Sequence, residues 1–301
     1  MITSFEDFCL WTYVVVDDLW RELAPYWRRR GPAPGCSDSE LLTLALVGEC
    51  RGWDVETELL QAWEPYHALF PRLPSQSRFN RRRRQLAEGF NLLRRVLLGL
   101  LDLAQDRQCA IDSLPVPVVR CHAAAHARGD WAAHGATYGR VPSKRLLIYG
   151  YKLHVLVTLS GVILDFALVP ANIHDLVAGL DLLDGHRDLA AVGDKAYISA
   201  AAAADLWQRR GIRLLTVPRR HEHRELPPDW VRVLNAARQI IATVNGQLAE
   251  QFRIEVNHAH TFAGLCARLQ TKLAAHTLCV YLNRVLGQPD WLQIKALAYP
   301  N

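Results

Sequence analysis

Apolar residues recur at helical spacing through the first hundred residues of the chain. Phe8, Trp11 and Val15 lie three and four residues apart and open a stripe that predicts a helix. Ser37 and Glu40 stand in the positions of a capping box, directly ahead of another apolar run. This pattern predicts four helices, over residues 5–30, 37–50, 54–70 and 76–106. A bundle of short helices is therefore expected.

The pattern changes to short apolar runs at about residue 109. Residues 146–159 are rich in β-branched and aromatic side chains, and Ser160-Gly161 turns this run into a second one over 162–170. Strands are also expected within 109–116, 189–193 and 213–218, and helices over 174–184, 199–210 and 230–252. Antiparallel strands followed by alternating helices and strands indicate an α/β mixed sheet.

Two of these apolar runs end in an aspartate. Asp112 follows one run, and Pro115 and Pro117 come soon after it; since they have no N–H to donate, these prolines are expected to end the strand. Asp194 follows a second run of the same kind. If the two strands lie side by side, the carboxylates converge, as a divalent metal with oxygen ligands requires. The alternative for Asp112 is that it caps the following turn.

The predicted helix over residues 230–252 carries two rows of side chains. Its apolar stripe recurs every three or four residues and marks the face expected to be buried: Leu234, Ala237, Ile241, Val244, Leu248 and Phe252. Beside the stripe lies a second row: Arg238, Ala242, Asn245 and Ala249. A helix packed against the sheet that bears the aspartates would offer this second row to the site.

Composition and charge narrow the class of protein. The 301 residues are half hydrophobic, yet no apolar stretch reaches the roughly 18 residues of a membrane helix. Seven scattered cysteines and an acidic start, unlike a signal peptide, indicate the reducing cytoplasm. The net charge is only +5, but arginines cluster at 28–30 and 81–84. These clusters favour phosphate contacts, with a solvated helix face as the alternative.

Residues 119–145 are rich in alanine, histidine, glycine and arginine and are expected to form a loop. His122 and His126, four residues apart, could share a helix face as metal ligands. We favour a flexible basic loop near a DNA backbone.

Five short motifs stand in order along the chain: Ile111-Asp112-Ser113, Gly150-Tyr151-Lys152-Leu153-His154, Pro170-Ala171-Asn172-Ile173-His174-Asp175, Gly193-Asp194-Lys195-Ala196-Tyr197, and Arg238 followed four residues later by Ala242. Together they resemble the motifs of DDE transposases of bacterial insertion sequences. The closest resemblance is to insertion-sequence family 982, which the segment Ser75–Arg84 also resembles. The resemblance extends over nearly the whole chain.

This resemblance implies a ribonuclease H-like mixed α/β sheet flanked by helices and preceded by an all-helical DNA-binding region. The implied domains are 1–106 for DNA binding, 107–285 for catalysis and 286–301 as a C-terminal tail. The implied function is a transposase that binds terminal inverted repeats, then cleaves DNA and transfers strands with two Mg²⁺ ions, or Mn²⁺. The implied partners are double-stranded DNA and a second copy of the chain, in the bacterial cytoplasm at the nucleoid.

The resemblance also assigns the catalytic positions. Asp112 and Asp194 correspond to the first two acidic metal ligands of the family. The third is a glutamate in a pattern resembling Ile-Glu-Thr-Val, whereas this chain has Ala242 in that place. Glu250 lies roughly 12 Å farther along the helix axis, too far to substitute. Cleavage is therefore expected to be impaired while DNA binding survives.

Further residues receive roles by the same resemblance. Contacts with DNA are expected from Arg78, Arg81, Arg82, Arg83, Arg84, Lys152, Lys195 and Arg238. Supporting roles around the metal ligands are expected for His154, Asn172, His174 and Tyr197. The alternative for each is an ordinary fold residue, which we favour for His154 and Tyr197. Two other functions remain open: a non-catalytic, transposase-derived DNA-binding protein, and a ribonuclease H-like nuclease without strand transfer.

Overall fold

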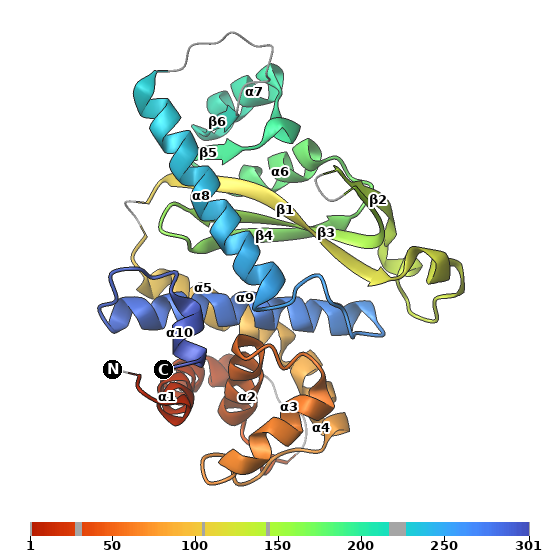
Figure 1. Cartoon of the computed structure of the whole chain (residues 1–301), viewed down its shortest axis with the longest axis vertical. Coiled ribbons are helices and arrows are strands. Elements are labelled where there is room, and N and C mark those ends of the chain that lie inside the picture. Colours follow the sequence, from red (N-terminus) through yellow and green to blue (C-terminus); the bar gives the residue numbers. More distant parts are fainter. Residues whose placement is uncertain (1, 28–31, 104–105, 143–144, 217–226, 301) are drawn as a thin grey trace. The chain divides into compact units, whose positions relative to one another are not determined.

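The computed structural model describes residues 2–27, 32–103, 106–142, 145–216 and 227–300. Arg28, Arg29 and Arg30, one of the two predicted phosphate-binding clusters, fall outside these ranges. The chain divides into two units (Figure 1). The helical unit consists of Met1–Leu101, Glu250–Ile254 and His258–Asn301, and the sheet unit of Asp102–Ala249 and Glu255–Asn257.

Each part of the helical unit that was predicted to be helical contains an α-helix, although the one within 5–30 ends at Leu23 and the one within 54–70 ends at Trp63. Its helices are α1 (Phe5–Leu23), α2 (Asp38–Cys50), α3 (Glu56–Trp63), α4 (Gln76–Gln85), α5 (Ala87–Leu100), α9 (Phe262–Val285) and α10 (Ile294–Ala298). Both hydrogen bonds of the capping box form between Ser37 and Glu40, so the predicted start of α2 is confirmed. The single helix expected over 76–106 is wrong, because Leu86 leaves the helical conformation with ψ 8° and separates α4 from α5. No helix in the described ranges is long and apolar enough to span a bilayer.

α9 belongs to the helical unit and not to the sheet unit. It packs against α2 and α5, and most of its side chains are buried, among them Leu265, Leu269 and Leu273. The sheet unit is therefore shorter at its C-terminal end than the catalytic domain expected over 107–285. The functional division of the chain stays a prediction.

A set of buried charges lies inside the helical unit. The guanidinium of Arg83 and the ammonium of Lys272 both pair with the fully buried Glu49, the latter at 2.5 Å. Burial opposes the ionisation of Glu49, but the charges of Lys272 and Arg83 outweigh it and lower the pKa of this carboxyl. Arg83 also donates to Thr271 Oγ1 at 3.3 Å. These pairs connect α2, α4 and α9.

Among the described residues, the sheet unit contains one six-stranded mixed sheet, as predicted. Its strands are β1 (Gln108–Val119), β2 (Thr137–Val141), β3 (Leu146–Thr158), β4 (Ile163–Pro170), β5 (Ala190–Gly193) and β6 (Arg213–Thr216). Their order is β2-β3-β1-β5-β6, and β4 also pairs with β3. β1 is antiparallel to β3 and parallel to β5. β2 lies inside the segment 119–145, which the sequence predicted to be a loop.

Pro115 and Pro117 do not end β1, contrary to the prediction. The strand continues through both, with Pro115 opposite Lys152 and Pro117 opposite Gly150 of β3. On its other edge, β1 pairs with β5 only up to Ala110. Residues two apart in a strand direct their backbone N–H toward the same edge, so Pro115 and Pro117 lack an N–H on the same edge of β1. β5 has already ended along that edge, so no hydrogen bond between strands is lost there.

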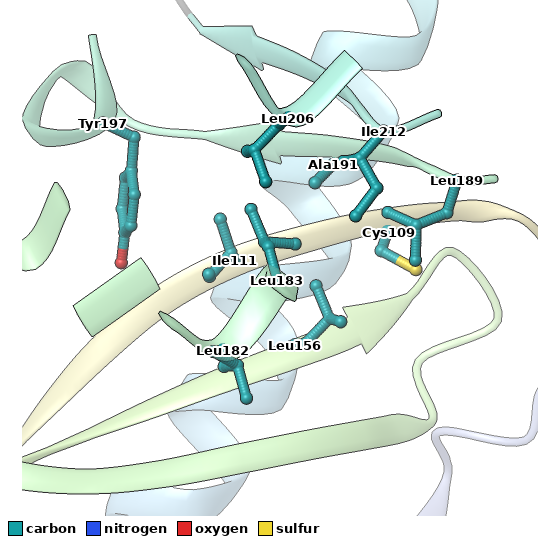
Figure 2. Packing of buried hydrophobic residues seen from close by; sticks show 10 residues of the cluster. All are labelled: Cys109, Ile111, Leu156, Leu182, Leu183, Leu189, Ala191, Tyr197, Leu206 and Ile212. Atoms are coloured by element: carbon teal, nitrogen blue, oxygen red, sulfur yellow. The ribbon is translucent and has the colours of Figure 1, made fainter. Parts of the chain in front are cut away.

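Helices cover both faces of the sheet. On one face, Ala110 and Val192 pack against Leu234 and Ala237 of α8 (Pro228–Glu250). On the other, the sheet packs against α6 (Asp175–Asp184) and α7 (Ala200–Arg210). Figure 2 shows this second cluster, which contains Cys109, Ile111, Leu156, Leu182, Leu183, Leu189, Ala191, Tyr197, Leu206 and Ile212. Because side chains alternate along a strand, Ala110 and Asp112 of β1 face α8.

Candidate active site

The parallel register of β1 and β5 brings the two aspartates level with each other. Ala110 lies opposite Val192, and Asp112 and Asp194 each come two residues after this pair. Asp194 keeps an extended backbone, with φ −75° and ψ −170°, so the alternation continues past the end of β5. Both aspartates therefore follow the residues that pack under α8.

Asp112 is held on both of its carboxylate oxygens. Oδ1 accepts the N–H of Ser113 at 2.8 Å, and Oδ2 accepts Nδ2 of Asn245 at 2.8 Å. Burial raises the pKa of Asp112 to about 6, and the negative charges of Asp194 and Asp175 act in the same direction. A buried carboxylate that other carboxylates repel is stabilised by a cation, so the electrostatics favour a positive charge here.

Asp194 is exposed and lies at the turn after β5. Its Oδ1 accepts the N–H of Ala196 at 2.8 Å, which begins the short 3₁₀ turn Lys195–Tyr197. This hydrogen bond fixes the orientation of the carboxylate and leaves Oδ2 for another partner. Lys195, beside it, is also exposed.

The second row of α8 faces the site, as the sequence predicted. The hydrogen bond from Asn245 to Asp112 places this row beside the first aspartate. Ala242 and Arg238, one and two turns earlier in the row, are both exposed. Position 242 thus has room for a longer side chain and carries no carboxylate.

Lys152 does not fit the predicted contact with DNA. Its Nζ pairs with Asp175 Oδ1 at 2.8 Å and donates to the carbonyl of Ile173 at 3.1 Å, and its side chain is only 13% exposed. Asp175, which pairs with Lys152, was not predicted from the sequence to be a site residue. Its place in the motif Pro170–Asp175 was a signal that could have found it, and its charge acts on Asp112.

Tyr197 and His154 form part of the packing behind the site. The Tyr197 ring lies so close to Gly179 and Gly193 that a Cβ at either position would come within 2.4 or 2.8 Å of ring atoms. Its hydroxyl is 3.2 Å from Nδ1 of His154. Burial lowers the pKa of His154 to about 4, so the imidazole is neutral near pH 7. These contacts agree with the interpretation of both as fold residues.

His174 and Asn172 order the chain between β4 and α6. His174 caps α6, because its Nδ1 accepts the N–H of Leu176 at 3.2 Å. Asn172 Oδ1 accepts the hydroxyl of Thr137 at 3.0 Å, which connects this segment to β2. Both residues thus shape the loop that ends in Asp175.

Of the five arginines of α4 that were predicted to contact DNA, two form ion pairs within the helical unit. Arg82, 14% exposed, pairs with Asp38 at 2.7 Å and donates to the carbonyl of Cys36 at 2.7 Å. Arg83 is 2% exposed and pairs with Glu49. Neither fits the predicted contact, because reaching a phosphate would break these pairs.

The other three arginines remain available on α4. Arg78, Arg81 and Arg84 are exposed and lie three residues apart. A groove of about 870 Å³ in the helical unit is lined by Arg78 and Arg81, together with Arg72 and the ring of Trp27. Its charge and an aromatic side chain suit a nucleic-acid strand.

The donors at the aspartate pair fit a hard divalent cation. They are two carboxylates and Oδ1 of Asn245, a buried oxygen with no hydrogen-bond partner. Within the described ranges, no group of three or more His, Cys, Asp or Glu side chains is placed to hold a metal ion, so His122 and His126 belong to no such group. The candidate donors for a metal are therefore two acids and an amide.

The comparison with protein families agrees with this arrangement. Residues 105–261, more than half of the chain, match the family described as a transposase DDE domain. The matched segment includes both aspartates and position 242. No curated protein and no solved structure matches the chain. This chain belongs to the family of DDE transposases.

Proposed function

We propose that the chain is the transposase of a bacterial insertion sequence of the family 982 type. It would bind terminal inverted repeats, cleave DNA and transfer the cut strand to a target. Family membership implies a DNA-cleaving and strand-transferring enzyme. The observation that supports the proposal for this chain is the register of β1 and β5, in which Ala110 pairs with Val192 and Asp112 and Asp194 each follow two residues later.

The chain's own residues would hold the metal and the DNA. Asp112 and Asp194 would bind the cation, and Asn245 lies beside Asp112, to which it is hydrogen-bonded through its amide. When bound, two Mg²⁺ ions, or Mn²⁺, would activate a water or a DNA 3′-OH and stabilise the leaving oxygen in an in-line displacement. Lys195, which follows Asp194 in the chain, and Arg238, in the same row of α8 as Asn245, are both exposed and would contact phosphates.

The alanine at position 242 favours the interpretation that catalysis by this chain is impaired. The family glutamate would supply a charged ligand from the exposed row of α8, and alanine supplies none. One metal then has fewer ligands and less compensating charge. We expect DNA binding to persist and cleavage to fall by orders of magnitude.

A non-catalytic DNA-binding protein is the second candidate, and Ala242 is the observation that favours it. The two candidates differ in a nicking assay on terminal-repeat DNA with Mg²⁺ or Mn²⁺. Slow, metal-dependent nicking that Asp194→Asn abolishes would support the transposase, and binding without any nicking would support the second candidate. A pre-cleaved end added to the assay detects strand transfer, which a ribonuclease H-like nuclease would not perform.

The exposed arginines of α4 are expected to carry much of the DNA affinity. The variant Arg78→Ala/Arg81→Ala/Arg84→Ala should weaken binding and lower the slope of log K against log salt by about 2–3, since each phosphate contact contributes about 0.9. Fluorescence anisotropy over a salt series measures both quantities.

A matched control removes the same charge elsewhere. Arg21, Arg95 and Arg232 are also exposed but lie on α1, α5 and α8. Their triple alanine variant should keep the slope of the unaltered chain. Equal slopes in the two triple variants would contradict the assignment to α4.

Pairing of two transposon ends would require two active sites. We therefore propose a homodimer on double-stranded DNA, acting in the cytoplasm at the nucleoid.

A further inference from the structure

Asn245 presents a buried oxygen beside the first aspartate. Its Nδ2 donates to Asp112 Oδ2 at 2.8 Å, and its Oδ1 is buried without a hydrogen-bond partner. Buried polar atoms are almost always paired, so an orphan of this kind calls for an explanation. In the observed orientation, therefore, only the nitrogen end of this amide is paired.

We propose that Asn245 is itself a metal ligand, and that its Oδ1 completes the oxygen set formed with Asp112 and Asp194 for one divalent cation. The inference rests on the proposed function, which assigns the two aspartates to a metal. It goes beyond that assignment by taking the ligand of α8 from position 245, one turn after Ala242.

The observed spacing suits this role. Two oxygens at right angles on one Mg²⁺, each at 2.0–2.1 Å, lie about 2.8–3.0 Å apart. Asn245 already holds its Nδ2 at 2.8 Å from Asp112 Oδ2. A half-turn of the amide about its last side-chain torsion, which is soft, puts Oδ1 in that place. The turn gives up one hydrogen bond, which a cation between the two oxygens replaces.

The charges also suit a single cation. Two carboxylates and a neutral amide carry two negative charges, which balance one divalent ion. Asp112 and Asp194 with Asn245 therefore explain how this chain binds one metal although it lacks the family glutamate. The second ion would be the one that Ala242 leaves without a charged ligand.

The test reads the ligand directly. The full-length chain is prepared with asparagine labelled with ¹³C at the side-chain carbonyl, loaded with Mn²⁺ and measured by electron–nuclear double resonance. We expect a coupling from a carbon about 3 Å from the metal, since the carbonyl oxygen bonds at about 2 Å. The coupling should be absent in Asn245→Ala and kept in Asn235→Ala, an exposed residue of the same helix.

Mn²⁺ affinity, measured by titrating the free-ion signal, provides a second readout. Asn245→Ala should weaken the Kd by about ten-fold or more, and Asn235→Ala should leave it within about two-fold. If Mn²⁺ binding depends on Asp112 but the unaltered chain shows no close ¹³C coupling, the proposed role of Asn245 is wrong and the proposed metal site stands. Binding that Asp112→Asn leaves unchanged would overturn the proposed metal site as well.

Discussion

Ala242→Glu is expected to raise the rate of terminal-repeat cleavage by at least about 100-fold. Altering a residue that merely supports a metal ligand costs 10–100-fold, and a missing ligand should cost no less. Position 242 is exposed, so the longer side chain meets no packing obstacle. It lies in the same row of α8 as Asn245, which already reaches Asp112 at 2.8 Å. Nicking with Mg²⁺ and with Mn²⁺ measures the change.

Ala242→Gln is the matched control for this gain. It adds the same length without the charge, and should recover little of the activity. Asp194→Asn introduced together with Ala242→Glu should abolish the gain. Equal and robust nicking by the unaltered chain and by Ala242→Glu would show that position 242 has no part in catalysis.

Arg83→Met is expected to destabilise the chain by about 3–5 kcal/mol, because it leaves Glu49 charged and buried without one of its partners. The exposed fractions of the two side chains are 2% and 0%, so water cannot compensate for the loss. Denaturant unfolding followed by tryptophan fluorescence measures the change.

Arg84→Met provides the comparison within the same helix. Arg84 is exposed, so its replacement should change the free energy of unfolding by less than about 0.5 kcal/mol. A similar small effect of Arg83→Met would contradict the structural role of Arg83 and return it to the candidates for DNA contact.

The sequence was a good guide where a pattern has one physical cause. The similar run-and-aspartate design around Asp112 and Asp194 required neighbouring strands if the two carboxylates were to converge, and β1 and β5 do pair in parallel. The apolar stripe of α8 likewise predicted which row would lie beside the sheet, and Asn245 of the second row bonds to Asp112. The spacing of apolar residues shows which face of a strand or helix is buried, and the buried faces determine which side chains reach this site.

Partners that are distant along the chain could not be predicted in this way. The run Arg81–Arg84 looks uniform, yet Glu49 and Asp38 of α2 engage Arg83 and Arg82 and leave only their neighbours exposed. Pro115 was expected to end β1, but its effect depends on which edge of the strand still needs hydrogen bonds. Such outcomes are decided by tertiary contacts, which local propensity does not contain.

The most direct test of the account is a crystal structure of the chain soaked in Mn²⁺, with anomalous data collected above the manganese absorption edge. We expect an anomalous peak between the carboxylates of Asp112 and Asp194, with Asn245 Oδ1 turned toward it. Two results would contradict the metal-dependent chemistry proposed for this chain. One is well-ordered aspartates in saturating Mn²⁺ with no anomalous peak between them, and the other is carboxylates that point to different faces of the sheet.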